Sequence, residues 1–374
     1  GNDRLAGTTG ADTILGGRGD DTLTGGKGDD RIDGGLGDDT AVFSGARSDY
    51  RVSRNADGSL RLVDRRSGSP DGTDTLTGIE HVRFSDRTAS ARSLAAGTPP
   101  DDLNGDGISD LLLQNGGSVV DWIMGAGRYA SGNGVGDAGA YTVVGTGDFD
   151  GDGTTDVLLQ NGSSVVQWTM RDGRYASGNV VGEAGAYRVI GTGDFDGDGT
   201  TDVLLQNGSS VVQWAVRDGR VVSGNVVGDT GAYHVVGTGD FDGDGTTDVL
   251  LQNGSSVVQW AVRDGRVVSG NVVGEAGSYR VVGTGDFNGD GTTDVVLQDG
   301  AAVVAWIVGG GHVVSGSLVG NAVGYHVAGT GDYDGDGTSD LALQNGSSVV
   351  SWLMSNGAYA GGTGVGEAGR FGIV

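Results

Sequence analysis

The sequence has 374 residues, among them 78 Gly, 3 Pro and no Cys, and its formal net charge is −26 at pH 7. The lack of Cys excludes a disulfide scaffold and a thiolate metal site, and the acidity argues against a nucleic-acid partner, since phosphate binding needs a basic surface. No stretch of 18 apolar residues occurs, so we predict no membrane insertion. The length allows two or more domains, and the fixed spacing of the glycines indicates repeats rather than disorder.

The first 45 residues repeat with a period of nine. Residues 16–24 are followed in register by residues 25–33 and 34–42, and looser copies precede them. Position 6 of each unit is Asp and position 8 is apolar, which predicts short strands that direct one side chain per unit into a thin core. Because rows of Asp on successive turns repel one another, we expect bound cations to cross-link the turns.

This pattern resembles the G-G-x-G-x-D-x-U-x nonapeptide of RTX proteins, which fold as a parallel β-roll with Ca²⁺ between turns. The resemblance implies that residues 1–45 form such a roll and bind several Ca²⁺ through position-6 Asp and backbone carbonyls. It also implies a secreted bacterial protein that leaves the cell unfolded by type I secretion and folds outside. The ligands carried over from the resemblance are Asp12, Asp21, Asp30 and Asp39.

Residues 46–97 are predicted to form a β-rich cap and linker. Residues 49–52, 60–63 and 81–84 alternate apolar and polar side chains as half-buried strands do, and Asp57-Gly58 predicts a hairpin turn between the first two. The segment 74–80 resembles the one that closes β-rolls in secreted RTX proteins. We interpret His81 as a strand residue without chemistry, and residues 95–100 as a linker.

A unit of 46 residues recurs six times in the remainder of the chain, and each copy begins with an acidic nonapeptide. Positions 1, 5 and 9 are always Asp, position 3 is Asp or Asn, and positions 4 and 6 are Gly. A hard cation such as Ca²⁺ takes about six to eight oxygen ligands, which closely spaced Asp can supply, and Gly permits the positive φ that bends the loop. Position 7 is expected to contribute its carbonyl.

The predicted ligands at positions 1, 3, 5, 7 and 9 of the six loops are Asp102, Asn104, Asp106, Ile108 and Asp110; Asp148, Asp150, Asp152, Thr154 and Asp156; Asp194, Asp196, Asp198, Thr200 and Asp202; Asp240, Asp242, Asp244, Thr246 and Asp248; Asp286, Asn288, Asp290, Thr292 and Asp294; and Asp332, Asp334, Asp336, Thr338 and Asp340. The loops hold 22 of the chain's carboxylates, so predicted calcium ligands account for much of its negative charge. We expect about six Ca²⁺ in these loops.

Each 46-residue unit also contains four short β patterns separated by turn signals such as Asn161-Gly162, which is typical of a β-propeller blade. The first unit lacks the strand that precedes its loop, and residues 371–374 supply a matching strand at the end of the chain. We therefore predict an all-β protein in which residues 98–374 form a six-bladed propeller closed by its last residues. Closure would remove the free sheet edges.

The nonapeptide resembles the calcium loop of FG-GAP (VCBS-type) propellers, the family that includes the integrin α-subunit head. The resemblance covers residues 99–374. Integrin heads have seven blades and this chain has six, so a truncated chain would lack a seventh. Residue 1 falls inside a repeat and no initiator Met precedes it, so we expect a fragment or a processed form.

Each blade contains one Trp, which could stack on sugars or pack between blades. Trp168 alternates with Val166 and Met170, which favours packing. The repeated Gln160-Asn161 pair could bind a ligand, but Asn-Gly is first a turn. The sequence contains no H-E-x-x-H, G-x-S-x-G or P-loop motif, and sixfold repetition fits binding better than catalysis, so we predict that the chain is not an enzyme.

Two functions remain after these exclusions. The first is a secreted, calcium-stabilised adhesion or lectin-like module that binds cell-surface glycans or proteins. The alternative is the C-terminal export, folding and targeting region of a secreted hydrolase, such as a serralysin-like zinc metalloprotease, whose catalytic domain is absent from this chain. The sequence upstream of Gly1 would discriminate between these two functions. The repeat pattern does not indicate an oligomeric state. In either case we expect the chain to be largely disordered without Ca²⁺.

Overall fold

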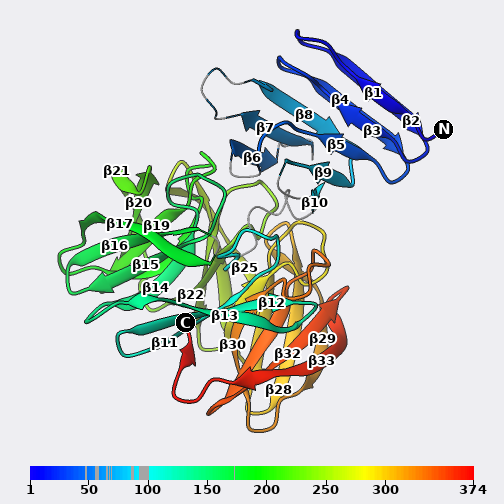
Figure 1. Ribbon diagram of the computed structural model, residues 1–374. Helices are drawn as coiled ribbons and strands as arrows, with labels where there is room; N and C mark the ends of the chain where they lie inside the picture. The colour runs from blue at the N-terminus through cyan, green and yellow to red at the C-terminus, as the bar shows by residue number, and fades with distance from the viewer. Residues whose placement is uncertain are drawn as a thin grey trace. The chain divides into compact units, whose positions relative to one another are not determined.

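The computed structural model describes residues 1–46, 49–54, 59–64, 66, 68, 70–85, 88–91, 101–171 and 173–374 (Figure 1). It is all-β, as predicted, and it divides into two compact units, one made mainly of residues 1–98 and the other mainly of residues 99–374. The predicted turn at Asp57-Gly58 and the predicted linker at residues 95–100 lie outside the described residues. Among the described residues, no helix has the length and apolar character needed to cross a membrane.

The first unit contains the parallel roll that the nine-residue period predicts. Strands alternate between two five-stranded sheets, so neighbours within a sheet are 18 residues apart, as in the pairing of Arg4 with Thr22. One sheet consists of β1 (Arg4–Ala6), β3 (Thr22–Thr24), β5 (Thr40–Val42), β9 (His81–Arg83) and β10 (Thr88–Ser90). The other consists of β2 (Thr13–Arg18), β4 (Arg31–Leu36), β8 (Thr73–Thr77), β7 (Leu60–Asp64) and β6 (Tyr50–Arg54).

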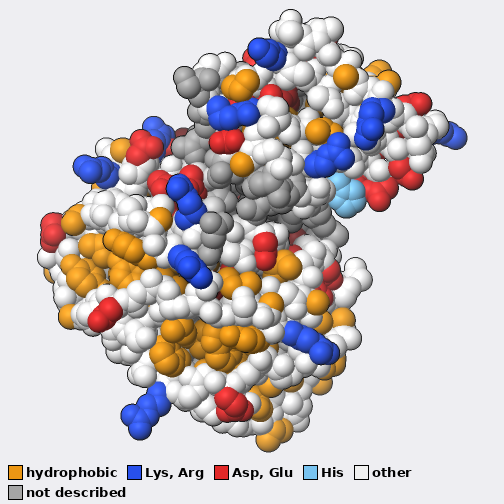
Figure 2. Space-filling view, in the orientation of Figure 1, with side chains coloured by type: hydrophobic (Ala, Val, Ile, Leu, Met, Phe, Trp, Pro, Cys, Tyr) orange, Lys and Arg blue, Asp and Glu red, His pale blue; other side chains and the backbone are white. Residues whose placement is uncertain are grey.

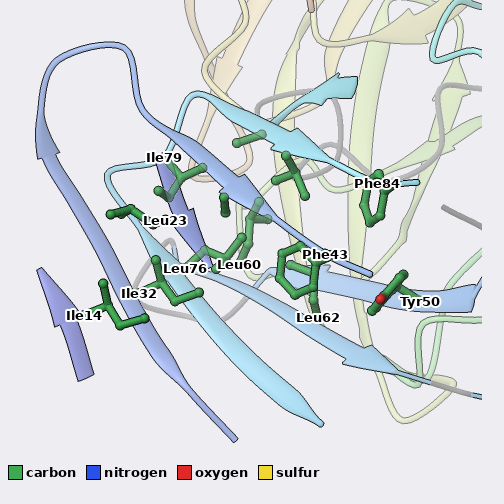
Figure 3. Packing of buried hydrophobic residues seen from close by; sticks show 13 residues of the cluster. Ile14, Leu23, Ile32, Phe43, Tyr50, Leu60, Leu62, Leu76, Ile79 and Phe84 are labelled. Carbon is green, nitrogen blue, oxygen red and sulfur yellow. The ribbon is translucent and has the colours of Figure 1, made fainter. Parts of the chain in front are cut away.

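The position-8 side chains fill the space between these two sheets. Ile14, Leu23, Ile32 and Leu76 are buried in one cluster, and Figure 3 shows them lying between the strands. This cluster widens toward Phe43, whose ring contacts those of Tyr50 and Phe84. The roll itself therefore has one apolar side chain per turn, and its larger aromatic core is supplied by the residues that follow.

The segment predicted to close the roll continues its sheets. Strand β8 pairs in parallel with β4, and β9 pairs in parallel with β5. The hairpin β6–β7 then pairs antiparallel with β8, and β10 pairs antiparallel with β9. These antiparallel strands cover the sheet edges, which would otherwise expose unpaired backbone groups.

The second unit is the predicted six-bladed propeller, and each blade is a four-stranded antiparallel sheet. The first blade contains β11 (Leu111–Asn115), β12 (Ser118–Gly125), β13 (Arg128–Asp137) and β34 (Gly372–Ile373). The next two contain β14 (Thr142–Gly147), β15 (Asp156–Asn161), β16 (Ser164–Arg171) and β17 (Arg174–Glu183), and β18 (Arg188–Gly193), β19 (Asp202–Asn207), β20 (Ser210–Arg217) and β21 (Arg220–Asp229). The last three contain β22 (His234–Gly239), β23 (Asp248–Asn253), β24 (Ser256–Arg263) and β25 (Arg266–Glu275); β26 (Arg280–Gly285), β27 (Asp294–Asp299), β28 (Ala302–Gly309) and β29 (His312–Asn321); and β30 (His326–Gly331), β31 (Asp340–Asn345), β32 (Ser348–Ser355) and β33 (Ala358–Glu367).

The ring closes as the sequence predicts, because β34 at the end of the chain pairs with β11 of the first blade. Side-chain hydrogen bonds also join one blade to the next. Gln160, for example, donates to the carbonyl of Tyr187 and accepts from the backbone N–H of Val189, both in the strand region of the following blade. The repeated Gln thus takes part in blade-to-blade pairing, and the ligand-binding alternative is not needed to explain it.

Each Trp lies at the seam between its own blade and the preceding one. A Cβ added at Gly136 would lie 3.1 Å from the ring of Trp168, so a residue without a side chain is needed at this close approach. The same contact recurs around the ring, from Gly182 and Trp214 to Gly366 and Trp122. This placement agrees with the inter-blade packing that the alternation favours, although the indole rings remain only partly buried.

Candidate metal centre

In five blades the acidic nonapeptide forms the loop that connects the first and second strands, and in the first blade it directly precedes β11. All twelve glycines at positions 4 and 6 have positive φ, for example 75° at Gly197 and 82° at Gly199, as the sequence predicts. In the third blade the position-1 carboxylate lies inside the bend and accepts hydrogen bonds from the backbone N–H groups of Gly197 (2.7 Å), Asp198 (3.0 Å) and Gly199. Glycine and aspartate together therefore wrap each loop around its first carboxylate.

Four of the six loops bring three carboxylates together at one point. Their ligand atoms lie within 4.8 Å of one another, which suits a hard cation with oxygen ligands. Positions 1, 3 and 9 meet in three loops, and positions 1, 3 and 5 meet in the sixth. The groups are Asp148, Asp150 and Asp156; Asp194, Asp196 and Asp202; Asp240, Asp242 and Asp248; and Asp332, Asp334 and Asp336.

Position 5 has a second partner in two of these loops. Asp198 forms an ion pair with Arg217, and Asp244 forms the equivalent pair with Arg263. In the first and fifth loops position 3 is Asn, and no group of three carboxylates forms there among the described residues. Instead, Asn104 donates to Asp106 at 3.0 Å, and Asn288 donates to the equivalent Asp290. The role of the position-7 carbonyl groups as ligands stays a prediction.

The loop carboxylates are electrostatically unfavourable neighbours. Burial, together with the charges of Asp196 and Asp194, raises the pKa of Asp202 to about 8, although hydrogen bonds from Val216 and Gln213 act to lower it. Burial and the neighbouring carboxylates likewise raise the pKa of Asp194 to about 6. A bound cation would remove this repulsion, so the loop geometry fits a cation such as Ca²⁺.

These raised pKa values predict how the calcium-free chain responds to pH. The folded state binds more protons than the unfolded state between about pH 4 and pH 8, so its stability is greatest at acid pH and falls as pH rises through the folded pKa. We expect the calcium-free chain to retain more β structure at pH 5 than at pH 8. Calcium should reverse this order, because Ca²⁺ binds the deprotonated carboxylates. Far-UV circular dichroism in excess chelator and in saturating Ca²⁺ at both pH values would check the prediction, and equal β content at the two pH values without Ca²⁺ would contradict it.

Hydrogen bonds also link the six loops into a ring. The position-8 N–H of each loop donates to the position-1 carbonyl of the preceding loop, as from Thr201 to Asp148 at 2.8 Å. The bond from Ser109 to Asp332, at 2.7 Å, closes the ring between the first and last loops. A loop that is ordered by a cation therefore helps to hold its two neighbours.

The roll offers a second kind of cation site. Asp21, Asp30 and Asp39 are buried, and Oδ2 of each has no hydrogen-bond partner. A Cβ added at Gly16 would lie 2.5 Å from the carbonyl oxygen of Gly34 and 2.7 Å from Oδ2 of Asp21. The carbonyl oxygen of Gly34 and Oδ2 of Asp21 thus converge beside Gly16, and Oδ2 has no hydrogen-bond donor. This arrangement fits a cation shared by successive turns.

The ladder of carboxylates in the roll extends further than the nonapeptides predict. Asp12 donates its N–H to Oδ1 of Asp30, and Asp30 donates in turn to Oδ1 of Asp74, both at 2.8 Å. Asp39 donates to Oε2 of Glu80 in the same way. Sequence reasoning missed both acceptors, although residues 74–78 repeat the D-T-L-T-G of residues 21–25. His81, beside Glu80, pairs with Asp38 at 2.9 Å.

Two equivalent cavities of about 360 Å³ lie at propeller seams. Each is lined by the Trp and an Asn of one blade, by a Glu of the blade before it and by an aromatic residue of the segment that leads from one blade to the next. The first includes Trp214, Asn225, Glu183 and Tyr187, and the second includes Trp122, Asn133, Glu367 and Phe371. Outer strands nearby carry exposed apolar side chains such as Val226, and Figure 2 shows orange patches on the propeller surface. Aromatic faces beside amide and carboxylate groups can bind a polar ligand that has apolar faces.

Comparisons with known families agree with both repeats. Residues 6–41 match the RTX calcium-binding nonapeptide repeat in 4 copies. The FG-GAP-like repeat matches residues 148–205, 194–251 and 240–297. Both repeats indicate calcium binding, and both are typical of extracellular proteins. Among curated proteins, none matches this sequence significantly.

Solved structures resemble this chain at low sequence identity. An Agrocybe aegerita lectin, described with its specific recognition of non-reducing terminal N-acetylglucosamine, is 18% identical over 71% of this chain and 79% of its own, with a TM-score of 0.53. A Photorhabdus luminescens Tc holotoxin pore is 16% identical over 66% of this chain and 13% of its own, with a TM-score of 0.47. A nidogen–laminin complex chain is 10% identical, covering 70% of this chain and 95% of its own, with a TM-score of 0.46.

Proposed function

We propose that this chain, in which RTX calcium-binding nonapeptide repeats precede a six-bladed propeller with FG-GAP-like repeats, is a secreted carbohydrate-binding module whose folding depends on Ca²⁺. The pair of equivalent cavities at the propeller seams carries the proposal. Their volume lies in the range of small-ligand sites, and a Trp face beside amide and carboxylate groups can match the apolar and hydroxyl surfaces of a sugar ring. The fold relative from Agrocybe aegerita, which recognises terminal N-acetylglucosamine, suggests the first sugar to test.

Calcium has a structural role in this proposal. About six Ca²⁺ would bind in the propeller loops, through the residues named for positions 1, 3, 5, 7 and 9, and several more would bind in the roll. When bound, Ca²⁺ neutralises the converging carboxylates. The loop residues also reach the cavity, because Gln213, which lines it, donates to Oδ2 of the position-9 Asp202 at 2.8 Å. Ordering the loop therefore positions one wall of the cavity.

The roll supports an extracellular location. Its buried Asp ladder would be held apart by repulsion in a calcium-poor cytoplasm and joined where calcium is plentiful. A chain that stays unfolded inside the cell suits type I secretion. Such a roll also fits the alternative, in which this chain is the export and targeting region of a larger secreted hydrolase, and a sugar-binding propeller would then direct that enzyme to its substrate.

A paired substitution at the two cavities tests the sugar site. Trp122→Ala/Trp214→Ala should weaken glycan binding by about tenfold or more, since truncating a central aromatic side chain commonly costs about 2 kcal/mol or more. The matched control is Ser131→Ala/Ser223→Ala, which changes exposed positions on the adjacent strands β13 and β21, outside the cavity linings. A glycan array in millimolar Ca²⁺, followed by isothermal titration calorimetry, provides the measurement.

Because each Trp also packs at a blade seam, a second variant guards against loss of folding. Asn133→Ala/Asn225→Ala removes the cavity amides and leaves the indole packing in place. We expect it to weaken binding while melting at a temperature close to that of the wild type. Failure of the calcium-loaded chain to bind any glycan would refute the proposal, and unchanged affinity in both double variants would place the sugar elsewhere.

A further inference from the structure

The first blade contains a buried carboxylate for which the structure provides no hydrogen-bond donor. Asp121 lies on β12, is fully buried, and neither of its side-chain oxygens has a hydrogen-bond partner. Nearby, the position-9 Asp110 accepts a bond from the N–H of Met124 through Oδ1, whereas its Oδ2 is buried without a partner. Three orphan carboxylate oxygens therefore occur in one buried part of the blade, which is far costlier than a satisfied polar pair.

The equivalent positions of the other blades show what Asp121 replaces. Three blades carry Gln at this position, and its amide donates to Oδ2 of the position-9 Asp at 2.5–2.8 Å, although the uncharged Oε1 of Gln167 and of Gln259 is itself buried without a partner. The two remaining blades carry Ala305 and Ser351, which add no charge. Only the first blade places a second carboxylate where the others have a donor or a neutral side chain. The three Gln residues are Gln167, Gln213 and Gln259.

Side-chain length decides what can lie between the two carboxylates. Asp is one methylene shorter than Gln, so replacing the amide lengthens the 2.5–2.8 Å separation by about 1.5 Å, to roughly 4 Å. A shared proton needs oxygens about 2.5–2.7 Å apart. A gap of roughly 4 Å instead fits two Ca–O bonds of about 2.3–2.6 Å that meet at an angle. The opposite wall is Gly173 of the next blade, where an added Cβ would lie 2.9 Å from Oδ2 of Asp121.

The surrounding charge also favours a cation. Asp121 shares this buried region with Asp110, Asp101 and Asp102, whose negative charges repel its own. Asp101 accepts a hydrogen bond from Oγ1 of Thr146 at 2.6 Å, so its own carboxylate is held in place beside this group. A divalent ion would offset the charge of several of these residues at once, whereas a water molecule would leave it unchanged.

We propose that Asp121, together with Oδ2 of Asp110, binds a Ca²⁺ at a buried position of the first blade that has no counterpart in the other blades. Asp110 is also the position-9 residue of the first loop, so it would serve both this ion and the ion of that loop. All-oxygen carboxylate ligation selects a hard cation, and the calcium-binding repeats of this chain make Ca²⁺ the expected occupant. Because β34 closes the ring on this blade, an ion there would reinforce the seam between the two ends of the propeller.

Substitutions copied from the chain's own repeats test this site. Asp121→Gln reproduces the amide–carboxylate pair of three other blades and should fold, yet bind one Ca²⁺ fewer per chain. The reverse change, Gln213→Asp, should create the same position in the third blade and add one Ca²⁺ per chain. Bound calcium is counted by plasma mass spectrometry after equilibrium dialysis against buffered Ca²⁺, and thermal melts confirm that each variant is folded.

The outcomes separate this proposal from its rivals. A folded Asp121→Gln chain that binds as many Ca²⁺ as the wild type overturns it, and a raised melting temperature with that unchanged count would identify a shared proton or trapped water instead. A Gln213→Asp chain with an unchanged count also contradicts it. If the nonapeptide loops held no Ca²⁺ at all, wild type and variants would all lack propeller calcium, which is distinguishable from an equal non-zero count. The number of bound Ca²⁺ per chain is measured without sugar, so this test does not depend on the proposed sugar site.

Discussion

Removal of calcium is expected to abolish most of the β structure of this chain. In the absence of a cation the roll keeps three buried Asp oxygens without partners, and four propeller loops keep three carboxylates within 4.8 Å. Each site occupied at a hundred times its Kd contributes about 2.7 kcal/mol, so several sites together would exceed a typical domain stability of about 5–15 kcal/mol. Far-UV circular dichroism during titration with a chelator and then with Ca²⁺ would measure the loss and its recovery.

Magnesium supplies the control for this experiment. Mg²⁺ carries the same charge but demands near-ideal octahedral geometry and keeps much of its water, so it should restore the spectrum poorly at concentrations where Ca²⁺ restores it fully. Because hydrogen bonds join neighbouring loops around the ring, we also expect the recovery to be cooperative in Ca²⁺. Full β structure in excess chelator would be incompatible with both expectations.

Much of the architecture follows from periodicity alone. A nine-residue unit with one apolar position can bury that position only by stacking in parallel, and the pairing of strands 18 residues apart confirms it. The 46-residue unit predicts blades, and the missing strand before Asp102 predicts closure by residues 371–374, which β34 confirms. In both cases a local pattern has a single way to satisfy its backbone hydrogen bonds, so repetition determines the fold.

The features that the sequence does not predict depend on contacts between distant residues. Asp74 and Glu80 extend the roll's carboxylate ladder, but no G-G-x-G turn precedes them, so the nonapeptide pattern does not reach them. Alternation placed Trp168 at a seam, yet it could not show that the equivalent Trp214 also lines a cavity together with the preceding blade. Asp121 becomes unusual only when its unpartnered oxygens are compared with the paired Gln residues of the other blades.

A single aspartate in the middle of the roll tests how far the roll depends on its metal. Asp21→Ala removes the oxygen that converges with the carbonyl of Gly34, and it also removes the acceptor for the N–H of Asp3. Loss of one calcium site costs about 2.7 kcal/mol at a hundred times Kd, and loss of a hydrogen bond to a charged group costs about 1.5–3 kcal/mol. The sum is comparable to the stability of a small domain, so we expect the roll to unfold in saturating Ca²⁺ while the propeller remains folded.

Asp21→Asn and Asp20→Ala make this prediction specific to the metal. The Asn side chain can still accept from Asp3 and can donate to the carbonyl of Gly34, so it should lose calcium yet retain more of the roll than Asp21→Ala does. Asp20 is exposed, and its replacement removes the same charge but no carboxylate of the buried ladder. It also removes the acceptor for the N–H of Asp38, so Asp20→Ala should stay far closer to the wild type than Asp21→Ala does. Limited proteolysis with mass mapping of the fragments would report which unit opens. If Asp21→Ala leaves the roll as resistant as Asp20→Ala does, the packing of Ile14, Leu23 and Ile32, rather than calcium, holds the turns together.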